Sequence, residues 1–188
     1  LDLDDLLAIK KLREAVRGGA KVLHIASHAF ADPFDAGRSG IVLEPGQIAG
    51  QPPHYSDDDG FLSLPEILDL DLRVDLTFLA ACSGAVGERL PGEGLESLTA
   101  ALLEAGSGAA IGALWNVDDE AAFAIAAGFY ERVGRGEPVA AALRGARRAL
   151  AGSGSSALLP RRWAGWVLIG EGESPMAGGR PGRKTLGL

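Results

Sequence analysis

The chain has 188 residues, which suits a single domain with a substantial buried core. Hydrophobic residues make up 47% of the chain and charged residues 23%, proportions that are typical of a soluble globular protein. The formal net charge of −7 argues against nucleic acid as the main partner, because phosphate binding requires a basic face. No apolar stretch approaches the roughly 20 residues of a membrane span, so no membrane partner is expected.

The cysteine content and the start of the chain suggest where the protein works. A single cysteine cannot form an internal disulfide, so a reducing, cytoplasmic location is expected. No basic-then-apolar secretory leader opens the chain, which begins at Leu1 rather than at a methionine. We therefore expect a processed piece of a longer protein, whose upstream repeat or regulatory domain or partner protein is missing here.

Apolar runs and helical periodicity alternate along most of the chain. Short, continuously apolar runs predict buried strands at residues 22–26, 76–81, 109–115 and 166–169. Helical stripes and capping signals predict helices at residues 3–17 and others that begin near residues 63, 92–94, 118 and 138. This alternation predicts an α/β domain over residues 1–170, built as a three-layer sandwich around a mainly parallel sheet.

Two segments do not fit the alternating pattern. Residues 29–60 are rich in Gly, Pro and Asp, with one brief apolar break at residues 41–43, and are expected to form a loop. Residues 171–188 hold Gly, Pro and scattered basic residues with little to bury, so a disordered tail is expected.

Two reactive side chains follow the first two predicted strands. His28 comes after the first strand, and Cys82 closes the second. If these strands are parallel neighbours, an imidazole and a thiol emerge from one sheet edge, where open α/β folds place their sites. Since imidazole can accept the proton that makes cysteine nucleophilic, the pair predicts a cysteine–histidine hydrolase.

Simpler interpretations exist for several of these residues. Cys82 could be an inert core cysteine, because free cysteines are often buried. His24 lies in the middle of a strand and is best interpreted as a core histidine with its hydrogen bonds satisfied. Three histidines and one cysteine without close ligand spacing give no zinc pattern, and we expect neither a metal nor another cofactor.

Four motifs in chain order carry a resemblance to a known family: HIASHA, LAACSG, LWNVDDE and WAGWVLIG. Together they resemble the CHAT domain, a caspase- and separase-related cysteine peptidase module often found beside tetratricopeptide repeats. The likeness covers about residues 20–170, and the histidine precedes the cysteine by roughly 50 residues, as in caspases. The resemblance implies the caspase–hemoglobinase fold, cleavage of a polypeptide, His28 as catalytic histidine and Cys82 as nucleophile.

The resemblance also implies an oxyanion site formed by the backbone N–H groups of Cys82 and Ala29. The family usually has glycine where this chain has Ala29. Alanine keeps the N–H, but its methyl group is expected to disfavour a glycine-like backbone angle or to crowd the carbonyl. One lost oxyanion donor typically lowers the rate by about 100- to 1,000-fold.

Asp118 and Asp119 follow the third predicted strand and have two compatible interpretations. Acids at a helix N-terminus cap free N–H groups and interact favourably with the helix dipole. The resemblance adds substrate binding, because related separases bind a basic residue before the scissile bond with an acid in this region.

Two other functions of the domain stay open: a catalytically silent interaction module, and a cysteine-dependent amidase or acyl transferase for small molecules.

Overall fold

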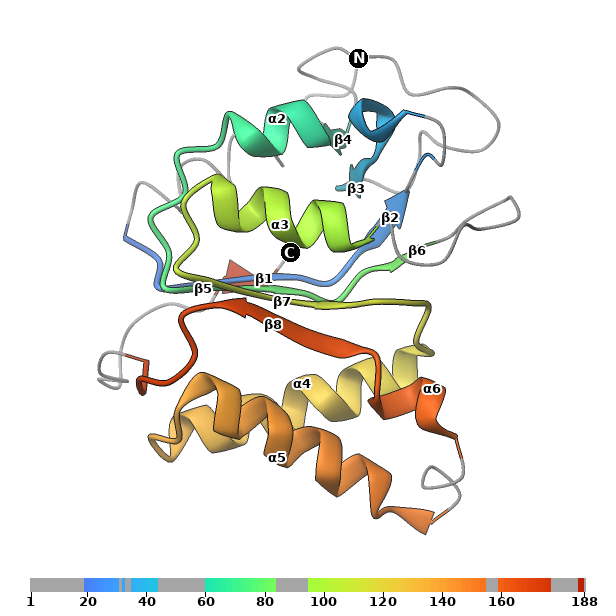
Figure 1. The fold of residues 1–188 in the computed structure, drawn as a ribbon, viewed down its shortest axis with the longest axis vertical. Helices are drawn as coiled ribbons and strands as arrows, with labels where there is room; N and C mark the ends of the chain where they lie inside the picture. Colours follow the sequence, from blue (N-terminus) through green and yellow to red (C-terminus); the bar gives the residue numbers. More distant parts are fainter. Residues whose placement is uncertain are drawn as a thin grey trace.

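The structure is a computed structural model, and it describes residues 19–30, 32, 35–43, 60–83, 95–154, 159–176 and 186–187. The helix predicted over residues 3–17 lies outside the described residues. Two sheets and the helices that pack on them make up the described part of the chain (Figure 1).

The main sheet has the strand order β8-β7-β5-β1-β9. Its strands are β1 (Val22–Ile25), β5 (Leu76–Leu79), β7 (Ala109–Ala113), β8 (Trp166–Gly170) and β9 (Leu186–Gly187). All neighbours run parallel except β8, which is antiparallel to β7. The four predicted strands and the mainly parallel sheet are thus confirmed. Every residue of β5 and β7 is buried, as expected for continuously apolar strands that are covered on both faces.

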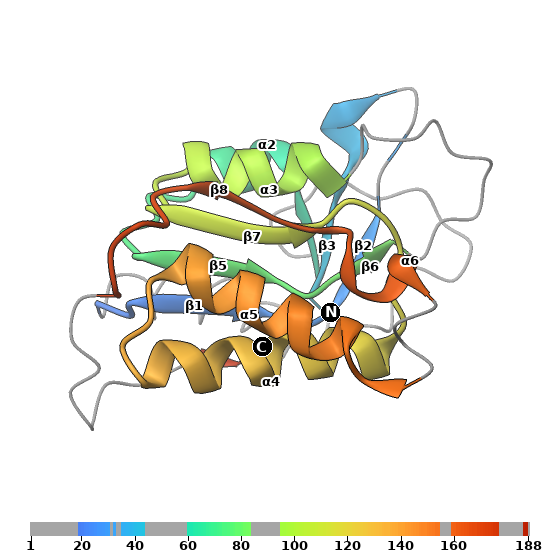
Figure 2. The ribbon, with the colours of Figure 1, turned by 60° about the horizontal axis from the view of Figure 1, so that its bottom comes forward.

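Helices cover both faces of the main sheet, which confirms the predicted three layers. One face carries α2 (Leu64–Leu68) and α3 (Leu95–Glu104), and the other carries α4 (Asp119–Gly134) and α5 (Val139–Ala151) (Figures 1 and 2). A short helix, α6 (Pro160–Trp163), connects α5 to β8. Among the described residues, no helix is both long enough and apolar enough to cross a membrane.

Capping residues place the helix starts where the sequence predicts them. Ser63 and Glu66 form a reciprocal capping box at α2, with the Ser63 N–H donating to Glu66 Oε2 over 2.8 Å. Asp118 is the N-cap of α4, and its carboxylate accepts from the Ala121 N–H over 3.0 Å. Pro138 is the N-cap of α5 rather than its first helical residue.

A second, smaller sheet occupies part of the region in which a loop was predicted. Its strand order is β4-β3-β2-β6. The strands are β2 (His28–Phe30), β3 (Gly40–Val42), β4 (Phe61–Ser63) and β6 (Cys82–Ser83), with a 3-10 helix, η1 (Ala36–Arg38), between β2 and β3. The predicted loop over residues 29–60 is therefore wrong for β2 and β3.

Gly40 illustrates why the second sheet escaped sequence analysis. A glycine at this position suggests a loop, yet Gly40 lies in β3 opposite Ser63. A Cβ atom there would lie 2.4 Å from the Leu62 carbonyl oxygen and 2.5 Å from the Phe61 ring. The glycine is thus required by the close packing of β4 rather than by a turn.

The end of the chain contributes one strand to the main sheet. Residues 171–176 and 186–187 are the described parts of the segment for which disorder was expected. Leu186 pairs with Leu23, and Gly187 pairs with His24, so that β9 lies parallel to β1. These two residues form a strand where the sequence gives no strand signal.

His24 lies on the face of β1 that packs against α4, as expected for a core histidine. Its ring stacks on Phe78 with centroids 5.1 Å apart, and its Nδ1 lies 2.7 Å from the Tyr130 hydroxyl oxygen. Burial lowers the pKa of His24 below its ordinary value of 6.5, because the cation loses hydration. The prediction of a hydrogen-bonded core histidine is confirmed.

The lowered pKa of His24 predicts an acid-sensitive fold. The unfolded chain binds a proton at His24 more tightly than the folded chain, so stability is full above pH 6.5 and falls as the pH drops below that value. Urea unfolding between pH 7.5 and pH 5 should show this loss, and His24→Phe should reduce it. Tyr130→Phe is the matched control, since it keeps the buried imidazole; an equal slope in all three chains would contradict the prediction.

Candidate active site

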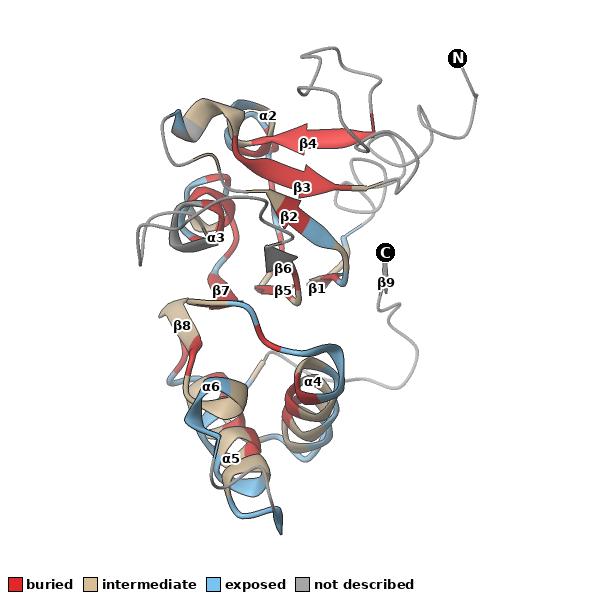
Figure 3. Cartoon of the chain, turned by 90° about the vertical axis from the view of Figure 1, so that its right-hand side faces the viewer, coloured by how far each residue is buried: buried red, intermediate tan, exposed pale blue. Residues whose placement is uncertain are grey.

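The candidate site lies where two parallel strands leave the main sheet together. β1 and β5 pair up to Ile25 and Leu79, and the Ala80 N–H then donates to the Ile25 carbonyl over 2.8 Å. The segments that follow both strands then enter the second sheet as β2 and β6. There, His28 of β2 and Cys82 of β6 are direct register partners. Figure 3 looks onto this edge and shows β2 next to the ends of β1 and β5, and Figure 1 shows β6 beside β2. The predicted neighbouring strands are confirmed.

His28 is held between two neighbours in the second sheet. It pairs with Val42 of β3 on one side and with Cys82 of β6 on the other. The His28 side chain is exposed, whereas the next residue, Ala29, is 2% exposed and belongs to the core under α2 and α3. Alternation along β2 thus points the imidazole away from this core.

Ala29 is accommodated without backbone strain. It lies in the extended strand β2, and no non-glycine residue in the described ranges has a positive φ. Its methyl group is buried in the same core as Ile41 and Leu62. The expected conflict between an alanine methyl and a glycine-like backbone angle therefore does not arise here.

The turns on either side of β2 carry side-chain hydrogen bonds that sequence analysis missed. The Ser27 hydroxyl donates to the Val42 carbonyl, directly beside His28. At the other end, the Asp32 N–H donates to Ser39 Oγ over 3.0 Å, and Arg38 lies 3.5 Å from the Asp32 carboxylate. In the sequence, the serines and aspartates around β2 suggested only a loop. Their hydrogen-bond partners become apparent only once the position of β3 is known.

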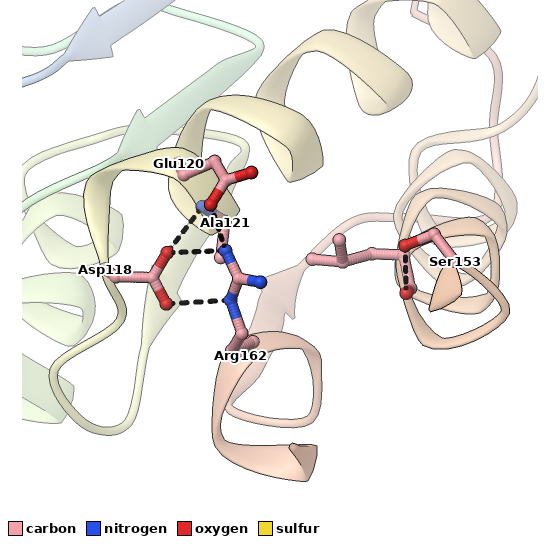
Figure 4. Close-up of polar contacts among 6 residues, drawn as sticks. Asp118, Glu120, Ala121, Ser153 and Arg162 are labelled. Atoms are coloured by element: carbon pink, nitrogen blue, oxygen red, sulfur yellow. Dashed lines mark hydrogen bonds and ion pairs between the residues drawn. The ribbon is translucent and has the colours of Figure 1, made fainter. Parts of the chain in front are cut away.

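Asp118 is engaged by an arginine from a distant segment. Arg162 of α6 donates from Nε to Asp118 Oδ2 over 2.9 Å and from Nη2 to Oδ1 over 2.8 Å (Figure 4). The same Nη2 lies 2.8 Å from Glu120 Oε2. This bidentate pairing holds the pKa of Asp118 below its ordinary value. The capping interpretation of Asp118 is confirmed, while Asp119 lies exposed in the first turn of α4.

α6 is fixed in place by contacts besides this ion pair. The Trp115 indole N–H donates to the Arg161 carbonyl over 2.7 Å. Arg147 donates to the carbonyls of Trp163 and Ala164 over 3.1 and 3.0 Å. Hence the Arg162 guanidinium is presented to α4 by an anchored segment.

The described residues contain no group of three or more His, Cys, Asp or Glu side chains that could hold a metal ion. His28 and Cys82 are register partners, whereas Asp118 is the N-cap of α4 and Asp119 its first residue, after β7.

The described part of the chain is a three-layer α/β sandwich in which a histidine and a cysteine are register partners beyond neighbouring parallel strands, as fits a caspase-like domain. A family model, "CHAT domain", matches residues 1–171, and the chain belongs to the CHAT domain family. Mouse tetratricopeptide repeat protein 28 is 35% identical over 109 residues, which are 58% of this chain and 4% of that protein. The chain thus spans a small part of the length of this relative.

Proposed function

We propose that this domain is a cysteine endopeptidase whose catalytic dyad is His28 and Cys82. The observation that carries the proposal is the register of β2 and β6, in which these two residues are direct partners. Residues in register on neighbouring strands lie about 5 Å apart and share one face of a sheet. Side chains that start from such positions can reach one another for proton transfer between an imidazole and a thiol.

The proposed reaction uses the dyad twice. His28 accepts the proton of the Cys82 thiol, and the thiolate sulfur bonds to the carbonyl carbon of the scissile peptide. The peptide C–N bond then breaks as His28 gives its proton to the leaving amine. Water hydrolyses the thioester and regenerates the thiol. The exposure of His28 supports this role, because a substrate chain needs access to the ring.

The proposed oxyanion donors are the backbone N–H groups of Cys82 and Ala29. β6 is the edge strand of the described second sheet, which leaves one side of its backbone unpaired within that sheet. β2 lies between β3 and β6, so the Ala29 N–H points toward a neighbouring strand. We therefore assign the main donor role to Cys82 and the supporting role to Ala29.

Of the two acids Asp118 and Asp119, one is proposed to bind a basic residue before the scissile bond, arginine above lysine. Asp118 already accepts two hydrogen bonds from Arg162, so its charge is largely compensated. Asp119 is exposed at the same helix start. In this proposal Asp119 binds the substrate side chain, while Asp118 holds α6 and the helix start in place.

The relative and the family supply the proposed context. In this proposal the substrate is a polypeptide in the cytoplasm. A repeat domain, a regulatory domain or a partner protein delivers this substrate or activates the peptidase domain. The name of the mouse relative supports a tetratricopeptide-repeat setting. The alternatives are a silent CHAT module and an acyl transferase or amidase that uses the same dyad.

A peptide library tests the proposed activity and specificity together. Incubation with the chain should give new termini after arginine and lysine, and Cys82→Ser should abolish them. Asp119→Asn should reduce cleavage after basic residues at least tenfold, while Glu131→Gln, a matched exposed acid near the other end of α4, should not. Cleavage that survives Cys82→Ser would refute the proposal. A reactive Cys82 without any peptide cleavage would favour the acyl transferase, and an unreactive one the silent module.

A further inference from the structure

We propose that Ser27 is a positioning residue that sets His28 opposite Cys82. This inference rests on the proposed cysteine–histidine dyad, and it names the residue that fixes the geometry of the dyad. Ser27 itself would touch neither substrate nor reacting atoms. Its effect would pass through the backbone of the neighbouring histidine.

The dyad lies just beyond a break in the sheet. β1 ends at Ile25 and β2 begins at His28, while β5 ends at Leu79 and β6 begins at Cys82. The register across the two strands is nevertheless the same before and after the break. Some contact must therefore keep the two neighbouring segments aligned across the two residues of each segment that lie outside regular strand pairing.

Ser27 supplies the side-chain hydrogen bond at this break. The four residues in the two gaps are three alanines and one serine, namely Ala26, Ser27, Ala80 and Ala81. Alanine has no side-chain donor or acceptor. The backbone bond from Ala80 to Ile25 ties the two strands to each other at the start of the break, and the Ser27 hydroxyl ties the end of the break on the histidine side to β3.

The acceptor of the Ser27 hydroxyl explains why the effect falls on His28. Ser27 donates to the carbonyl of Val42, and Val42 is the register partner of His28 in β3. The bond thus links the residue before His28 to the residue opposite it. Val42 is 6% exposed and its strand is buried throughout, so the acceptor is held by the core. Losing the hydroxyl would free the backbone on the N-terminal side of His28.

The test measures how the rate of Cys82 alkylation by iodoacetamide depends on pH in the full chain. Ser27→Ala should raise the midpoint of that profile by about 0.5 pH unit, which is about a threefold slower reaction near neutral pH. Ser27→Thr, which keeps the hydroxyl, should restore the wild-type midpoint. Because Ser27 acts through His28, the double variant Ser27→Ala/His28→Ala should match His28→Ala alone.

Ser39→Ala is the matched control for simple loss of stability. Ser39 is 2% exposed and its hydroxyl accepts from the Asp32 N–H, at the far end of the β2–β3 connection. Both serine variants should lower the melting temperature by about 3 °C, but only Ser27→Ala should move the alkylation midpoint. An unchanged midpoint in Ser27→Ala, alongside a shift in His28→Ala, would overturn the role of Ser27 and leave the dyad standing. Unchanged midpoints in both would overturn the dyad and this inference with it.

Discussion

Iodoacetamide is expected to alkylate Cys82 rapidly at pH 7, and His28→Ala is expected to slow this reaction about tenfold. An isolated cysteine with a pKa near 8.5 is only about 3% thiolate at pH 7. A histidine beside a cysteine stabilises the thiolate and so raises its population near neutral pH. The register pairing of β2 with β6 is the structural basis for this expectation.

The chain is well suited to this measurement. Cys82 is its single cysteine, so the mass added by the label reports on that thiol alone, and Cys82→Ser gives the blank. His24→Phe is a matched control, because it removes a histidine that packs against Phe78 and Tyr130 instead of the candidate site. Equal rates in the wild-type chain and in His28→Ala would refute the dyad.

Phe78→Ala is expected to lower the free energy of unfolding by about 4 kcal/mol. Phe78 is fully buried in β5, and its ring contacts a set of aromatic side chains on both sides of the interface between the sheet and α4: His24, Phe129, Tyr130 and Trp166. Truncation would leave a cavity that these large rings cannot fill without leaving their own contacts. The loss would be a large fraction of the 5–15 kcal/mol that stabilises typical domains.

Urea denaturation measures this effect, with Phe123→Ala as the control. Phe123 is the same residue type in α4, but it is 75% exposed. Its truncation should change the unfolding free energy by no more than about 0.5 kcal/mol. Similar losses in the two variants would contradict the assignment of Phe78 to the centre of the core.

Local patterns in the sequence were sufficient to predict the main sheet and its helices. Strands β5 and β7 are apolar throughout because both of their faces are covered, and a continuous apolar run is visible without any knowledge of its neighbours. Ser63 with Glu66, and Asp118 with the residues after it, predicted helix starts because capping acts within one turn. Trp166, the first residue of the predicted last strand, is 1% exposed in the core.

Contacts between distant segments were not predictable in this way. β2 and β3 are each three residues long, and β3 begins with a glycine, so nothing local distinguishes them from a loop. The Arg162 partner of Asp118 comes from a helix 44 positions away, and a list of acids and arginines gives no means of pairing them. The Ser27 bond to Val42 depends in the same way on where β3 lies.

Local sequence patterns alone are enough to identify the buried strands of the main sheet, the starts of its helices, and a thiol and an imidazole that follow two apolar strands. These features depend on hydrophobic periodicity and on capping, which act over a few residues. Only the tertiary structure decided that His28 and Cys82 are register partners, and that the strands carrying them belong to a second sheet. Register is set by packing and hydrogen bonding between segments far apart in the chain, which no local pattern encodes.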